Sequence, residues 1–152
     1  MSATLKRVLF VCIGNACRSQ MAEGFARAYG SDVIVPASAG LAPAMGVMRD
    51  TKRAMAEKQI DLTDHFSKSI RHLGRAQFDL VINMSGSGIP EDLASRAKVV
   101  EWDVDDPVFM KYEDHCAVRD QIEALVMKLI VDLRQEPKQP RFRGQGSGRL
   151  EL

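Results

Sequence analysis

Long apolar runs are missing from this chain of 152 residues, and so is an excess of charge of either sign. The apolar run nearest the N-terminus covers only residues 8–11, which is shorter than the core of a signal peptide and far shorter than a membrane span. The 21 basic and 20 acidic residues give a net charge of +1, which favours neither nucleic acid nor a membrane surface as a partner. We therefore expect a cytoplasmic protein that binds no nucleic acid and no membrane.

Cysteine and histidine are scarce, with three residues of each, and this scarcity disfavours two further classes of protein. An odd number of cysteines does not suit the disulfide framework of small secreted domains. The spacing of the cysteines and histidines does not match a zinc site. We expect no metal and no cofactor, so the cysteines are left for catalysis, redox chemistry or packing.

Strand-like and helix-like segments alternate along the chain. Apolar runs predict four strands, at residues 5–11, 32–37, 78–84 and 98–101. Helical spacing predicts a first helix that Ser19 caps and Gly30 ends, followed by helices at 47–58, 90–96 and 115–134. This order predicts an α/β fold, a single-domain doubly wound four-stranded parallel sheet with helices on both faces.

The predicted domain covers residues 1–134, where the apolar periodicity stops. Residues 135–152 contain two prolines and three glycines, and this composition predicts a disordered tail. In doubly wound sheets, ligands bind outside the carboxyl ends of the strands. Cys12 directly follows the first predicted strand, so we expect it at that edge of the sheet.

The segment from Cys12 to Arg18 has the residue types of an oxyanion-binding loop. A strand-to-helix turn points successive N–H groups inward, and the helix N-terminus adds partial positive charge. Arg18 adds a guanidinium suited to a tetrahedral oxyanion, Gly14 permits close approach, and Asn15 can adopt a left-handed conformation. A cysteine at the base of such a nest is held as a nucleophilic thiolate, which the Ser19 hydroxyl can also stabilise. The residues predicted to bind the phosphate are Ile13, Gly14, Asn15, Ala16, Cys17 and Arg18.

Residues 8–23, VLFVCIGNACRSQMAE, resemble the signature of the low-molecular-weight protein tyrosine phosphatases, which is a cysteine followed after five residues by Arg-Ser. The similarity covers about residues 5–134, including the stretches at 38–40, 78–81 and 106–107. Arsenate reductases share the same fold, and the sequence of residues 19–24 resembles theirs. The resemblance also implies that Ser38 supports the loop through a hydrogen bond to Asn15.

Cleavage of a phosphate ester needs a proton for the leaving oxygen, and three carboxylates crowd the loop at residues 103–106. The spacing alone leaves Asp103, Asp105 and Asp106 open, and all three could be ordinary turn residues. Pro107 restricts Asp106 to extended conformations, and the resemblance places the general acid of the family in such an Asp-Pro pair. We therefore expect Asp106 to be the acid, with Asp105 as the second choice.

Two further residues bear on the reaction. The resemblance suggests a reversible disulfide between Cys12 and Cys17, while burial as a small apolar side chain is the alternative for Cys17, and both can hold. Phe109 follows the Asp-Pro pair where eukaryotic members carry tyrosines that enclose the substrate ring, so it is either an aromatic wall or a packing residue. Thioredoxin-coupled arsenate reductases carry two extra cysteines after the third strand, and residues 82–90 here contain none.

The leading hypothesis is a cysteine-dependent phosphatase that hydrolyses phosphotyrosine or small aryl phosphate monoesters through a Cys12 thiophosphate intermediate. The alternative is an arsenate reductase that uses an external low-molecular-weight thiol, because this route needs only the first cysteine. A non-catalytic phosphate-binding protein is disfavoured by the presence together of Cys12, Arg18 and Asp106. The expected partners are a phosphorylated protein or a small phosphate or arsenate oxyanion, with a thiol reductant in the second case.

Overall fold

The computed structural model describes residues 5–136, which form a four-stranded parallel sheet covered by helices. The strands are β1 (Lys6–Cys12), β2 (Ile34–Gly40), β3 (Leu80–Asn83) and β4 (Lys98–Glu101), in the spatial order β2-β1-β3-β4. The helices are α1 (Arg18–Tyr29), α2 (Arg49–Ala56), α3 (Glu91–Ala94) and α4 (Tyr112–Gln135), with a short 3-10 helix at Ile70–Leu73. Because β2 and β3 flank β1 on opposite sides, the switch in strand order lies at the carboxyl end of β1.

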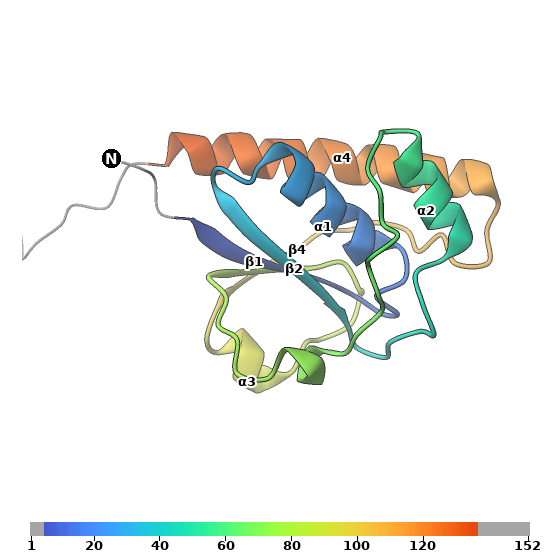
Figure 1. The fold of residues 1–152 in the computed structure, drawn as a ribbon. Helices are drawn as coiled ribbons and strands as arrows, with labels where there is room; N and C mark the ends of the chain where they lie inside the picture. Colours follow the sequence, from blue (N-terminus) through green and yellow to red (C-terminus); the bar gives the residue numbers. More distant parts are fainter. Residues whose placement is uncertain (1–4, 137–152) are drawn as a thin grey trace, which may run out of the picture.

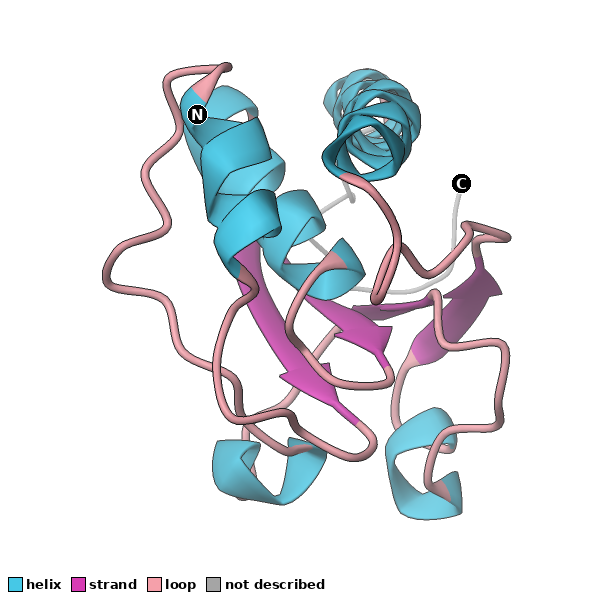
Figure 2. Ribbon diagram, turned by 90° about the vertical axis from the view of Figure 1, so that its right-hand side faces the viewer, coloured by secondary structure: helices cyan, strands magenta, loops and turns pink. Residues whose placement is uncertain are grey.

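Strand β1 is buried on both faces because helices cover both sides of the sheet. Helices α1, α2 and α4 lie on one side, and α3 and the 3-10 helix lie on the other (Figure 1, Figure 2). Val8 and Phe10 belong to the apolar cluster on the first side, while Leu9 and Val11 belong to the cluster on the second. This alternation follows from the two-residue period of a strand, and it explains why the buried part of β1, from Val8 onward, is a continuous apolar run.

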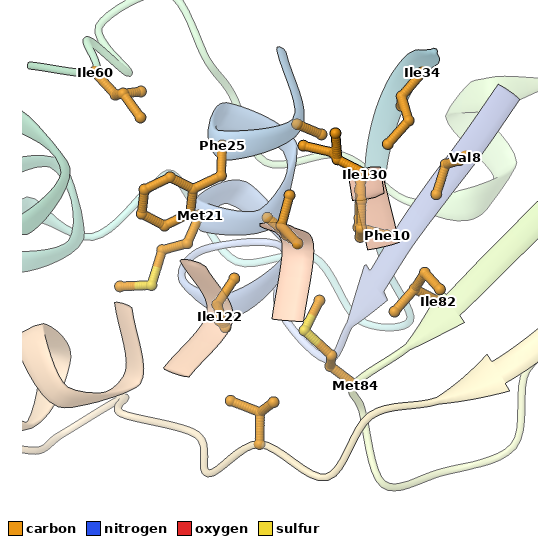
Figure 3. Packing of buried hydrophobic residues seen from close by; sticks show 14 of the residues in the cluster. Val8, Phe10, Met21, Phe25, Ile34, Ile60, Ile82, Met84, Ile122 and Ile130 are labelled. Carbon is orange, nitrogen blue, oxygen red and sulfur yellow. The ribbon is translucent and has the colours of Figure 1, made fainter. Parts of the chain in front are cut away.

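The larger apolar cluster joins α1 and α4 to the sheet. Figure 3 shows Met21 and Phe25 of α1 packed in the same cluster as Ile122 of α4 and Phe10 of β1. At the end of α1, a Cβ on Gly30 would lie only 2.6 Å from a side-chain carbon of Ile130. A side chain at position 30 would therefore require Ile130 of α4 to move.

The predicted fold class is confirmed, and the differences from prediction are the ends of several elements and one short additional helix. Helix α4 begins three residues before the predicted start, where the Asp114 carboxylate accepts a hydrogen bond of 3.2 Å from the Lys111 N–H. The 3-10 helix at Ile70–Leu73 was not predicted. Gln135, the first residue of the predicted tail, still belongs to α4, and residues 137–152 lie outside the described part of the chain. None of the helices between residues 5 and 136 has the length and hydropathy of a bilayer span.

Candidate active site

The loop between β1 and α1 turns its carbonyl groups toward the segment that follows β2. The carbonyl oxygens of Cys12, Ile13, Gly14 and Ala16 accept hydrogen bonds of 2.8–3.1 Å from N–H groups in residues 41–48. Within residues 5–136, the N–H groups of residues 13–16 have no acceptor. These groups lie just before the N-terminus of α1, and such an arrangement can bind an anion.

Gly40, the last residue of β2, allows this loop to lie against the end of the sheet. A Cβ on Gly40 would lie 2.6 Å from the Ile13 carbonyl oxygen and 2.8 Å from the Asn15 nitrogen. Both contacts are with backbone atoms, which cannot rotate away as a flexible side chain can. Any residue other than glycine would therefore displace the oxyanion-binding loop.

Asn15 adopts the left-handed conformation that the sequence suggested, with φ of 50°, and it is fully buried. Its Nδ2 donates to Ser19 Oγ over 2.7 Å. Its Oδ1 accepts from Gln20 Nε2 over 2.9 Å and from the Lys68 N–H over 3.0 Å. A non-glycine residue pays a steric cost in this conformation, and these hydrogen bonds offset it and fix the loop.

Ser19 connects this network to the predicted nucleophile. Its Oγ lies 2.9 Å from Cys12 Sγ, and both residues are buried. Because Ser19 Oγ accepts the hydrogen bond from Asn15, its own proton is free to point at the Cys12 sulfur. The prediction that Ser19 caps the helix is wrong, since Ser19 is the second residue of α1 and Cys17 occupies the N-cap position.

The predicted hydrogen bond from Ser38 to Asn15 is also wrong. Ser38 Oγ, on β2, donates instead to the carboxylate of Glu23 on α1. Asn15 receives its support from a different segment, because Ser67 Oγ donates to its carbonyl oxygen over 2.8 Å. The one sequence signal for this network was Gln20, a polar residue on the buried side of α1, and its role was missed.

Arg18 begins α1 and is 5% exposed. Its Nη1 donates to the carbonyl oxygens of Met84 and Val104, with the second contact at 3.1 Å. Its Nε has no hydrogen-bond partner within the described residues, although it is buried. Buried donors are normally satisfied, so the unpaired Nε beside a loop of free N–H groups suits an oxyanion ligand.

Asp106 is the carboxylate that the fold brings to Arg18. Its Oδ2 lies 3.3 Å from Arg18 Nη2, and its side chain is 38% exposed. Its Oδ1 accepts a hydrogen bond of 3.1 Å from the Val108 N–H, which orients the carboxylate. Neither Asp103 nor Asp105 makes an ion pair with Arg18 in the part of the chain that the structure describes. The geometry therefore singles out Asp106 among the three predicted candidates.

Phe109 lies in the same loop and is almost fully exposed, at 96%, with a left-handed φ of 66°. This exposure argues against the packing alternative and leaves the ring available for a substrate.

The residues between 5 and 136 include no group of three or more potential ligands placed to hold a metal ion.

The three cysteines are free thiols in different surroundings. Cys17 is 3% exposed, and burial raises its pKa to about 12, although a hydrogen bond from Thr51 acts in the opposite direction. Cys116 lies on α4, where its sulfur is 3.8 Å from Arg119 Nη1. Burial as a small side chain, one of the two alternatives for Cys17, is thus observed.

Comparison with known proteins relates this geometry to one family. A model of the family described as low molecular weight phosphotyrosine protein phosphatase matches residues 7–139. The glutaredoxin arsenate reductase of Synechocystis sp. is 34% identical over 132 residues, which are 85% of this chain and 99% of the relative.

Solved structures of two kinds share the fold. An arsenate reductase in the phosphate-binding state superposes with a TM-score of 0.77 at 34% identity, covering 85% of this chain and 99% of the other. The low molecular weight protein tyrosine phosphatase from T. tengcongensis gives a TM-score of 0.71 at 32% identity, covering 84% and 99%.

Proposed function

Because this chain belongs to the low molecular weight phosphotyrosine protein phosphatase family, we propose that its Cys12 thiolate attacks the central atom of a tetrahedral oxyanion. The reaction that the site geometry supports best is hydrolysis of phosphotyrosine or small aryl phosphate monoesters. The observation that carries this proposal is the Asp106 carboxylate held 3.3 Å from Arg18, because ester hydrolysis needs an acid for the leaving oxygen.

In the first step, the Cys12 thiolate attacks phosphorus and Asp106 protonates the leaving oxygen. The Ser19 hydroxyl, 2.9 Å from the sulfur, stabilises the thiolate before attack. The Arg18 guanidinium and the N–H groups of the loop bind the equatorial oxygens, whose charge is stabilised by donors that are already in place. Nη1 of Arg18 donates to two carbonyl oxygens, so the guanidinium is already held in place before the substrate binds.

In the second step, the Asp106 carboxylate accepts a proton from water as the water attacks the thiophosphate. Phosphate leaves and the Cys12 thiolate is regenerated. The exposed side chain of Asp106 suits this role, because the same group must reach first the leaving oxygen and then the incoming water. The exposed ring of Phe109 provides one wall for an aryl substrate in this proposal.

Arsenate reduction with an external low-molecular-weight thiol is the second candidate function. The names of similar proteins favour arsenate reduction over hydrolysis, whereas the position of Asp106 favours hydrolysis. Arsenate and phosphate are both tetrahedral oxyanions, so the same loop suits either. The chain contains only three cysteines, none of them in residues 82–90, so the second thiol would come from a soluble reductant.

One preparation assayed twice separates the two functions. We expect the wild-type protein to hydrolyse p-nitrophenyl phosphate without any reductant, and we expect Cys12→Ser to reduce hydrolysis to background. Arsenate reduction is then measured with thioredoxin, glutathione and mycothiol supplied separately. Reduction with a small thiol but no hydrolysis would replace the first candidate by the second, and a fully active Cys12→Ser variant would refute both.

A further inference from the structure

The loop between β4 and α4, which carries Asp106, is held on its β4 side by the Val104 carbonyl oxygen, which accepts from Arg18 Nη1 over 3.1 Å. On the α4 side, the hydrogen bonds of residues 107–111 in the described part of the chain stay within the loop and the first turn of α4. The position of that side of the loop therefore depends on how the first turn of α4 is held.

A strained residue lies on the same side of the loop. Phe109 has a left-handed φ of 66°, and a residue with a Cβ keeps this conformation only where the surrounding structure fixes the chain. Its ring is 96% exposed, so packing of the side chain does not supply this support. The preceding residue is Val108, whose N–H orients the Asp106 carboxylate. Relaxation of Phe109 would therefore move the group that orients the acid.

Tyr112, the first residue of α4, connects the end of this loop to α2. Its hydroxyl donates a hydrogen bond to the carboxylate of Glu57, directly after the last residue of α2. Its ring lies under the guanidinium of Arg53, whose central carbon is 3.8 Å from the ring centroid, within the range of a cation–π contact. The hydrogen bond to Glu57 raises the pKa of Tyr112, so the hydroxyl keeps the proton that it donates.

Helix α2 links the start of α4 to the oxyanion-binding loop, and Figure 1 shows it beside the first part of α4. The Met48 N–H, at the N-cap of α2, donates to the Ala16 carbonyl oxygen over 3.1 Å. Farther along α4, Arg119 Nη1 donates to the Ala54 carbonyl oxygen of α2 over 2.9 Å. Because this buried contact already joins the two helices, the contacts of Tyr112 serve to fix the first residue of α4.

We propose that Tyr112 is a positioning residue for the general acid. Its contacts with Glu57 and Arg53 fix the end of the acid loop relative to α2, and through α2 relative to the oxyanion-binding loop. The Asp106 carboxylate is thereby kept within reach of the leaving oxygen while the Cys12 thiolate attacks. The proposal rests on the general-acid role proposed above for Asp106, and Tyr112 acts through that group without touching the substrate.

The test compares the two tyrosines of the chain, because each donates from its hydroxyl to a glutamate. Tyr112→Phe keeps the ring under Arg53 and loses the hydrogen bond. We expect its kcat/KM for phenyl phosphate, a poor leaving group, to fall by about tenfold, which is part of the full effect of a general acid. For p-nitrophenyl phosphate, kcat/KM should fall by less than about twofold, since that leaving group departs without a proton. Tyr29→Phe, which removes the 2.8 Å hydrogen bond between α1 and Glu123 of α4, should change neither value.

Two variants of Glu57 test the same hydrogen bond from the other side. Glu57→Leu removes the acceptor and should reproduce the selective loss on phenyl phosphate. Glu57→Gln keeps an amide oxygen that can accept, so it should retain the wild-type ratio of the two kcat/KM values. These variants decide the question if Tyr112→Phe does not fold. Equal losses on both esters in Tyr112→Phe or Glu57→Leu, an unchanged ratio in either, or the same selective loss in Tyr29→Phe would overturn the proposal.

Amide hydrogen exchange of residues 105–111, followed by mass spectrometry, gives a measurement that does not depend on activity. We expect this segment to exchange faster in Tyr112→Phe than in the wild type, and at the wild-type rate in Tyr29→Phe. If this pattern is found in a protein whose wild type hydrolyses neither ester, the proposed function fails while the positioning of the loop by Tyr112 stands. Unchanged exchange in Tyr112→Phe would overturn the positioning role whatever the activity.

Discussion

Arg18 and Asp106 illustrate how single residues divide the work at this site. Arg18 is held from behind by carbonyl oxygens, so its remaining donors keep a fixed direction. Asp106 is more exposed, and the described part of the chain orients it through one backbone N–H and the guanidinium. The buried cation thus suits a permanent binding role, while the exposed carboxylate suits a group that gives and takes protons.

Substitution Asp106→Asn tests the acid role. We expect turnover of phenyl phosphate to fall by about a hundredfold or more, because a poor leaving group depends on general acid catalysis. Turnover of p-nitrophenyl phosphate should fall much less, since that leaving group departs without a proton. The matched control is Asp105→Asn, in the same loop, which should change neither rate. Equal losses for both substrates would remove Asp106 from the role of acid.

At the level of the elements, the sequence predicted the type and order of the strands and of the helices α1 to α4. The reason is that β1 contains the apolar run Val8–Val11 and α4 has a clear helical period, and both signals are local. The supports of the loop could not be predicted in the same way. Ser38 of β2 bonds to Glu23 of α1, and Ser67 bonds to the Asn15 carbonyl instead, because both pairings join segments that are far apart in the sequence.

The junction of β2 with the oxyanion-binding loop gives a prediction at this scale. In Gly40→Ala, the new Cβ would clash with Ile13 O and Asn15 N, so the loop must shift. A displacement of about 1 Å can cost about a hundredfold in rate, and we expect kcat/KM for p-nitrophenyl phosphate to fall by that order. Gly46→Ala is the control, because a Cβ there meets nothing within 4 Å. Unchanged kcat/KM in Gly40→Ala would show that loop position is not limiting.

The molecule as a whole has an apolar cluster on each side of one sheet, and this arrangement predicts a single unfolding transition. Ile122 of α4 is fully buried in the larger cluster. Leu93 of α3 is 4% exposed in the cluster on the opposite side of the sheet. Truncation to alanine should cost about 2–5 kcal/mol of unfolding free energy at either site. Ile122→Ala should lie higher in that range, because helices α1 and α4 hold the cavity open, whereas the four-residue α3 can settle into the space.

Trp102, the one tryptophan of the chain, makes this prediction easy to check. Its ring centroid lies 6.1 Å from that of Phe10, so its fluorescence reports on the side of the sheet that carries α1 and α4. Urea unfolding followed by fluorescence and by far-ultraviolet circular dichroism should give one midpoint for each variant, because both clusters share the strands of the sheet. If Leu93→Ala lowered the dichroism midpoint and left the fluorescence midpoint in place, the two sides would unfold independently.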